Sequence, residues 1–173
     1  MKGFWNSVNQ IKKGVEHDGW SKRTEEELRD ASKHLFYEIQ MLLGTAKKLS
    51  ILRGCQDEVL KNAVLEAFLI HARNLIDFLY TKPVQDDVAI EDFLEKAGKG
   101  EGIPAQSSFL CHQTKRINKK LAHLTYFRVL DEDVWDYLRI TEEIRGPLNV
   151  FLAQVPRELL DSSWNGISSF EDC

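Results

Sequence analysis

The chain has 173 residues, of which 43% are hydrophobic and 29% are charged. This composition excludes a largely disordered chain and fits one globular domain better than two. Three cysteines are far apart and form no CxxC pair, so neither a disulfide framework nor a thiolate zinc site is expected: Cys55, Cys111 and Cys173. The formal net charge of -4 argues against a protein whose whole surface attracts nucleic acid.

The sequence lacks the marks of membrane insertion and of export. No stretch approaches the roughly 18 consecutive apolar residues that a membrane span requires. The residues after Met1 also lack the apolar core of a signal peptide. Together with the cysteine pattern, this favours a cytoplasmic protein that does not contact a membrane.

The first predicted helix runs from about Thr24 to Leu52. Thr24 is a suitable N-cap, and three glutamates follow it at the positive end of the helix dipole. Leucines recur every seven residues along this segment and form one apolar seam: Leu28, Leu35, Leu42 and Leu49. A seam of this kind fits a coiled-coil dimer, but the core face of a bundle helix is the favoured interpretation.

The second predicted helix begins near Asp57 and ends at about Thr81. It is apolar around most of its circumference, which predicts a central position in the fold. Arg73 and Asp77, four residues apart, are expected to form an ion pair on its polar stripe. His71 lies among apolar residues, so its ring is expected to bond to a neighbouring helix.

Later elements are weaker until the third long helix. A short amphipathic helix is predicted over about 89–97, and the glycine-rich residues 98–104 indicate a loop. Ser107 or Ser108 is expected to cap the third long helix, which reaches about Phe127.

The fourth helix is expected to open at Asp131 or Asp133 and to be regular from about Val134. Gly146 and Pro147 should kink it or split it in two. Apolar residues are expected on its core face: Val134, Leu138, Ile144, Leu148, Phe151, Leu152 and Val155. After Pro156, the chain is expected to dock loosely or to fray.

These elements predict an all-α fold, an antiparallel bundle of four long helices with additional short helices. Residues 1–23 form an N-terminal extension, 24–155 the bundle domain, and 156–173 a C-terminal tail.

The third helix is strongly basic. Residues 111–128 contain no acidic side chain but carry five cations: Lys115, Arg116, Lys119, Lys120 and Arg128. The following residues, 131–143, carry six acidic side chains and one arginine. The two segments could therefore pair their exposed faces, which is the simpler interpretation. Alternatively, the basic strip could contact the phosphates of RNA.

Arg116 and His123 lie two helical turns apart on one flank of this helix. A guanidinium can hold phosphate oxygens with two hydrogen bonds, and an imidazole can move a proton near neutral pH. The run from Arg116 to His123 resembles the R-x(4-6)-H signature of HEPN domains (higher eukaryotes and prokaryotes nucleotide-binding).

The HEPN resemblance implies a compact helical bundle, often a homodimer, with metal-independent endoribonuclease activity in toxin or defence systems. Arg116 and His123 would be the catalytic pair, and the ribose 2'-hydroxyl would be the nucleophile, so no metal or cofactor is expected. An antitoxin-type protein is a possible partner. Lys115, Lys119, Lys120 and Asn118 would contact the substrate, with Arg73 and Asn74 of the second helix supplementing the site.

Two other functions remain open. The same bundle could be a catalytically inert interaction or scaffold module. It could also bind a small molecule, with Arg73, Asn74 and His71 lining a pocket between helices. Metal chemistry has less support, because the sequence contains no HxxxH, ExxH or HExxH motif.

Overall fold

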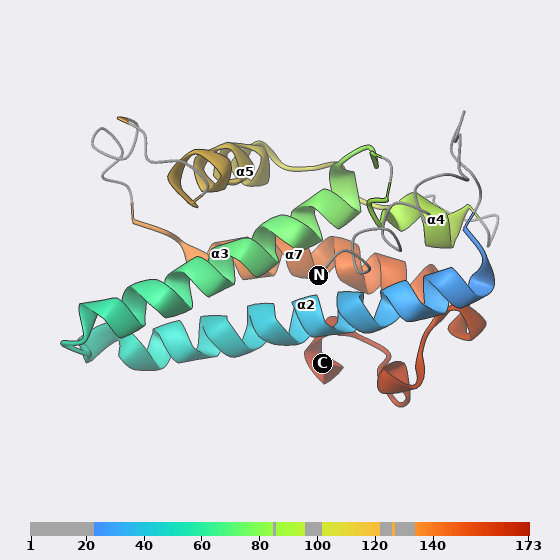
Figure 1. Cartoon of the computed structure of the whole chain (residues 1–173), viewed down its shortest axis with the longest axis horizontal. Coiled ribbons are helices and arrows are strands. Elements are labelled where there is room, and N and C mark those ends of the chain that lie inside the picture. The colour runs from blue at the N-terminus through green and yellow to red at the C-terminus, as the bar shows by residue number, and fades with distance from the viewer. Residues whose placement is uncertain (1–22, 85, 96–101, 122–125, 127–133) are drawn as a thin grey trace, which may run out of the picture.

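The computed structural model describes residues 23–84, 86–95, 102–121, 126 and 134–173 (Figure 1). Within these ranges no strand occurs, so the all-α class is confirmed. The five helices are α2 (Glu25–Ile51), α3 (Glu58–Tyr80), α4 (Ile90–Leu94), α5 (Ser108–Leu121) and α7 (Tyr137–Gln154). Four short 3-10 turns accompany them: η1 (Leu52–Gly54), η2 (Arg157–Leu159), η3 (Ser162–Trp164) and η4 (Phe170–Asp172). The predicted N-terminal extension, apart from its last residue, and most of the glycine-rich loop lie outside the described residues.

The start and the seam of α2 agree with the sequence. The Glu27 N–H donates to Thr24 Oγ1 at 3.2 Å, and the Thr24 N–H donates to a Glu27 carboxylate oxygen at 2.8 Å. This reciprocal capping satisfies two N–H groups that the first helical turn leaves without partners. The four seam leucines are buried within the single chain, which confirms that the seam is a core face.

α3 lies between α2 and α5 (Figure 1). Its first turn is capped by Asp57, whose carboxylate accepts a hydrogen bond from the Leu60 N–H at 2.9 Å. The helix buries residues along most of its C-terminal half: Phe68, Leu69, His71, Ala72, Leu75, Ile76, Phe78 and Leu79. The expected central position of this helix is therefore confirmed, and residues of α2, α5, α4 and α7 all contact it.

α4 is shorter than predicted, with a single turn and a half at Ile90–Leu94. It nevertheless fixes the end of the core, because Phe93 is fully buried. The ring of Phe93 lies edge-on to Phe78 of α3 and Phe151 of α7, with ring centroids 6.1 Å and 5.7 Å away. Such edge-to-face contacts add to the free energy gained by burying each ring.

The prediction for the start of α7 was wrong. Regular helix begins at Tyr137 and the N-cap is Asp136, which accepts from the Arg139 N–H at 3.0 Å. Val134 and Leu138 were expected in the core but are 90% and 51% exposed. Ile140 faces the core instead, together with the later residues of the predicted core face.

Gly146 and Pro147 also do not split α7 in two, which was one of the two expected outcomes. The helix is continuous from Tyr137 to Gln154, with Pro147 buried inside it. A proline removes one backbone hydrogen bond from a helix interior. The core packing of Ile144, Leu148 and Phe151 on either side accounts for the helix tolerating this loss.

The expectation that the C-terminal tail docks loosely or frays was wrong as well. Trp164 is 2% exposed and Phe170 is 1% exposed, so both side chains belong to the core. The indole N–H of Trp164 donates to the Ser32 carbonyl of α2 at 3.0 Å. The Phe170 N–H donates to the Asn149 side chain of α7 at 2.7 Å. The tail thus closes one side of the core against α2 and α7.

The finer architecture, an antiparallel four-helix bundle of HEPN type, stays a prediction. No described helix is both long and apolar enough to pass through a lipid bilayer. The three cysteines carry free thiols.

Candidate functional site

Of the predicted catalytic pair, only Arg116 lies among the described residues. His123 lies outside the described residues, as does the predicted extension of the third helix to Phe127, apart from Tyr126. Arg116, the other member of the predicted pair, is buried and only 3% exposed. Its guanidinium donates to Gln113 Oε1 at 2.8 Å and lies 4.1 Å from the ring centre of Trp135. In this position Arg116 joins α5 to the residues that precede α7.

The three predicted substrate-binding lysines lie on α5 and differ in exposure. Lys115 and Lys119 are exposed on α5. Lys120 is half-buried, and its Nζ lies 5.8 Å from the centre of the Trp135 ring. The acidic residues of α7 that are described serve other partners, since Glu143 accepts from Ser107 and Arg139, and Glu142 pairs with Arg145. Residues 131–133, the other part of the predicted acidic partner segment, lie outside the described residues.

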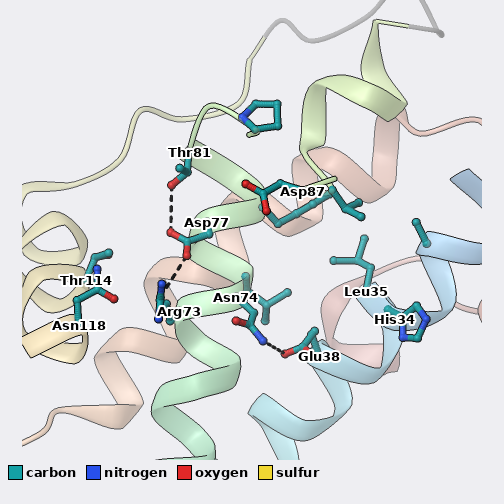
Figure 2. Close-up of a pocket in the computed structure, with 15 residues that line it drawn as sticks. His34, Leu35, Glu38, Arg73, Asn74, Asp77, Thr81, Asp87, Thr114 and Asn118 are labelled. Atoms are coloured by element: carbon teal, nitrogen blue, oxygen red, sulfur yellow. Dashed lines mark hydrogen bonds and ion pairs between the residues drawn. The ribbon is translucent and has the colours of Figure 1, made fainter. Parts of the chain in front are cut away.

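A cleft of about 730 Å³ lies where α2, α3 and α5 meet the segment that follows α3. Figure 2 shows α3 crossing the middle of this interhelical cleft, with α5 on one side and α2 on the other. The cleft brings together Arg73, Asn74 and Asn118, three of the six residues predicted to bind substrate. Nine of its lining residues are polar: His34, Glu38, Arg73, Asn74, Asp77, Thr81, Asp87, Thr114 and Asn118.

An ion pair and a hydrogen bond meet at Asp77 of α3, at the centre of the cleft. Arg73 Nε lies 3.3 Å from Asp77 Oδ2, which confirms the ion pair that the four-residue spacing predicted. The Thr81 hydroxyl donates to the other Asp77 oxygen at 3.0 Å (Figure 2). The Asp77 carboxylate therefore keeps both the arginine and the helix end in place.

Glu38 connects the α2 side of the cleft to α3. His71 Nδ1 lies 2.7 Å from Glu38 Oε2, and the Asn74 side-chain amide donates to the same oxygen at 3.1 Å. His71 is therefore a buried histidine bonded to a neighbouring helix, as its apolar surroundings predicted, and it does not line the cleft itself. One carboxylate thus orients two side chains of α3.

Asn118 forms the α5 side of the cleft together with Thr114. Figure 2 shows its side chain directed from α5 toward α3. Its Oδ1 is buried and has no hydrogen-bond partner. The Thr114 hydroxyl, by contrast, donates to the Leu110 carbonyl at 3.0 Å. A buried polar atom without a partner is uncommon in folded proteins and marks a place where a ligand group or a water can bind.

Apolar and charged groups are both present in the cleft. Leu35, Leu75 and Phe78 supply buried apolar surface, and Val88 adds a side chain that is 42% exposed. Its ionisable groups are the His34 imidazole, the Arg73 guanidinium and three carboxylates, those of Glu38, Asp77 and Asp87. Such a mixture of apolar surface with a few convergent polar groups is typical of small-molecule sites.

Sequence reasoning missed five polar residues of the cleft wall: His34, Glu38, Thr81, Asp87 and Thr114. Glu38 could have been found, because the polar neighbour expected for His71 had to come from an adjacent helix. Nothing in the sequence pattern places Asp87 beside α3.

Among the described residues, no group of three histidine, cysteine or acidic side chains is close enough to hold a metal ion. Comparison of the chain with protein-family models, curated proteins and solved structures found no match.

Proposed function

We propose that the protein binds a small molecule in the interhelical cleft. The observation that carries this proposal is the buried, unpartnered Asn118 Oδ1 on the wall of a 730 Å³ cleft. Small-molecule sites have volumes of roughly 300–1,000 Å³. The convergence of Arg73, Asn74 and Asn118 from two helices supports the same function, because a few placed polar groups set the orientation of a ligand.

The cleft is an unfavourable place for an RNA backbone. Glu38, Asp77 and Asp87 would each face the phosphates, and the one guanidinium, that of Arg73, is already paired with Asp77. Like charges at short range repel strongly where water is partly excluded. A small ligand avoids this repulsion.

A ligand screen by thermal unfolding tests the proposal. A ligand that binds only the folded state, at about 100 times its Kd, contributes about 2.7 kcal/mol to the free energy of unfolding. For a chain of this size each kcal/mol raises the Tm by about 2–4 °C, so the expected increase is about 5–10 °C. The panel should cover amines, amino acids, nucleosides and organic acids.

Matched variants assign any increase to the cleft. Asn118→Leu fills the α5 side of the cleft with an apolar side chain, whereas Lys115→Leu makes a similar change on the exposed face of the same helix. We expect Asn118→Leu to abolish the increase and Lys115→Leu to keep it. A ligand that stabilises both variants equally binds elsewhere, and this result would contradict the proposal.

A second candidate is RNA binding along the exposed side of α5. It is supported by the exposure of Lys115 and Lys119 on a helix that carries no acidic residue. The HEPN-type cleavage by Arg116 and His123 belongs to this candidate, as do the homodimer and the antitoxin-type partner. The burial of Arg116 weighs against a direct phosphate contact by that residue.

Salt titration separates this candidate from the first. For single-stranded RNA, log K falls with log salt concentration with a slope of about -0.7 per phosphate contact. The double change Lys115→Ala and Lys119→Ala should reduce that slope by about 1.4. The matched control changes Lys47 and Lys48, which are exposed on α2. Equal effects of the two pairs would count against an RNA site on α5, and unchanged RNA cleavage in His123→Ala would exclude the catalytic pair.

A further inference from the structure

The charge of the interhelical cleft indicates which class of molecule it binds. Three carboxylates line it, those of Glu38, Asp77 and Asp87, against the single guanidinium of Arg73. Arg73 is paired with Asp77 at 3.3 Å. Within the described residues, neither Glu38 nor Asp87 forms an ion pair with a lysine or an arginine. The cleft therefore has negative charge available to a ligand.

The hydrogen-bonding groups of the cleft point the same way. The buried Oδ1 of Asn118 can only accept, and it has no donor. Glu38 uses only its Oε2 on His71 and Asn74, and Asp87 uses only its Oδ2, on the Val84 N–H at 3.0 Å. Acceptors thus remain on both sides of α3, and a ligand with N–H donors can use those that the cleft exposes, on Glu38 and Asp87.

Apolar side chains lie between these acceptors. Leu35 and Phe78 line the cleft and are each 5% exposed, Leu75 beside them is fully buried, and Val88 is 42% exposed. A ligand with an alkyl or ring body would cover Val88 and gain roughly 25 cal/mol per Å² of apolar surface removed from water. A purely ionic ligand would leave that surface exposed.

From these three observations we infer that the ligand of the cleft is an amphipathic amine, a molecule with a protonated amino group joined to an apolar body. The inference rests on the proposed function and adds the ligand class to it. The ammonium group binds at the carboxylates of Glu38 and Asp87, and the apolar body packs against Val88 and Phe78.

Three probes with one alkyl chain and different head groups test this inference. Hexylamine, hexan-1-ol and hexanoate are titrated into the full ¹⁵N-labelled chain, and binding is followed by the NMR shifts of the Asn74 and Asn118 side-chain amides. We expect saturable shifts with hexylamine, with an affinity about tenfold above that of hexan-1-ol, since the head group gains charge-assisted hydrogen bonds. Hexanoate should bind most weakly.

Neighbouring carboxylates provide the matched variants. Asp87→Asn removes a charge from the cleft but keeps an oxygen for the Val84 N–H, whereas Asp86→Asn removes a charge from an exposed residue that does not line the cleft. Asp87→Asn should lower the hexylamine affinity about twofold to fivefold, the range for a partly exposed ion pair. Asp86→Asn should leave it within the error of the titration.

The possible contrary results lead to different conclusions. Equal affinities for hexylamine and hexan-1-ol would overturn the amine inference but leave a small-molecule site in the cleft. Preference for hexanoate would also overturn it and would assign anion binding to Arg73. Shifts with none of the three probes, or equal effects of Asp87→Asn and Asp86→Asn, would overturn the inference too. The metabolite screen then decides separately whether the cleft binds any ligand.

Discussion

The imidazole Nδ1 of His71 lies 2.7 Å from Oε2 of Glu38, and this contact joins α3 to α2 beside the interhelical cleft. Both side chains are largely withdrawn from solvent, with 10% and 21% of their surfaces exposed. The same carboxylate oxygen accepts from Asn74, a residue that lines the cleft. Glu38 therefore contributes both to the packing of two helices and to the geometry of the candidate site.

Removing this carboxylate should destabilise the fold. Glu38→Ala leaves His71 and Asn74 without their shared acceptor, and a buried donor without a partner costs about 1–3 kcal/mol. Urea unfolding measures the loss. The control is Glu66→Ala, an equal change of charge at an exposed position of α3. If the two variants lose the same free energy of unfolding, the contact between His71 and Glu38 contributes nothing specific.

The long helices α2 and α3 could be predicted from the sequence because their signals are local. Thr24 and Asp57 each cap a helix, and the leucine seam of α2 follows the helical period. For α7, apolar residues at helical spacing continue N-terminal to the helix itself, so the sequence predicts a start that is too early. Leu138 lies about 100° around the helix from the centre of the face that contains Ile144, which explains why it is exposed.

The candidate site was only partly predictable, because it depends on contacts between distant segments. Arg73 and Asn74 stand out locally as polar residues in an apolar helix. Nothing in the sequence distinguishes Glu38 and Asp87 from other acidic residues, because only the fold brings them to the same cleft. The basic character of α5 suggested that Arg116 binds phosphate, but an arginine that is buried beside a tryptophan cannot be distinguished in the sequence from one that is exposed.

The C-terminal tail should contribute a large part of the stability. Trp164→Ala removes a side chain that is 2% exposed and stacks edge-on against Phe36, with ring centroids 5.2 Å apart. Loss of a buried tryptophan costs about 3–5 kcal/mol, since a cavity replaces the removed ring. Leu138→Ala, which shortens a side chain that is 51% exposed, should cost far less. Similar midpoints of urea unfolding for both variants would show that the tail is not part of the cooperative core.

Acid should loosen the same tail. The side chain and the backbone N–H of Ser163 hold the pKa of Asp161 down to about 2, from an ordinary value of 3.8. A carboxylate with a lowered folded-state pKa stabilises the fold above its unfolded-state pKa, and this contribution is lost as the pH falls toward the folded-state value. The contribution of Asp161 is therefore complete above about pH 4 and disappears toward pH 2.

NMR titration of the Asp161 carboxyl carbon measures this pKa directly, and urea unfolding at several pH values measures its effect. Asp161→Asn should reduce the slope of the stability curve between pH 4 and pH 2 and leave the rest unchanged. The carboxylate of Asp172 has a similarly low pKa, about 2, because the Ser168 N–H donates to it. It provides a second site with the same expected behaviour. A pKa near 3.8 for Asp161 would contradict the hydrogen bonding between this carboxylate and Ser163.

A substitution of Arg116 distinguishes a structural role of this residue from a catalytic one. Its guanidinium lies 4.1 Å from the Trp135 ring centre and donates to Gln113, and lysine cannot reproduce the planar stacking of this group. Arg116→Lys should therefore lower the free energy of unfolding by about 1–3 kcal/mol, from the weakened cation–π contact and the buried hydrogen bond together. Lys115→Met, a change at the exposed neighbouring position, should cost less than about 0.5 kcal/mol. An Arg116→Lys protein with unchanged stability but reduced RNA cleavage would instead support the predicted catalytic pair, because a residue used only on substrate can be exchanged without loss of folding free energy.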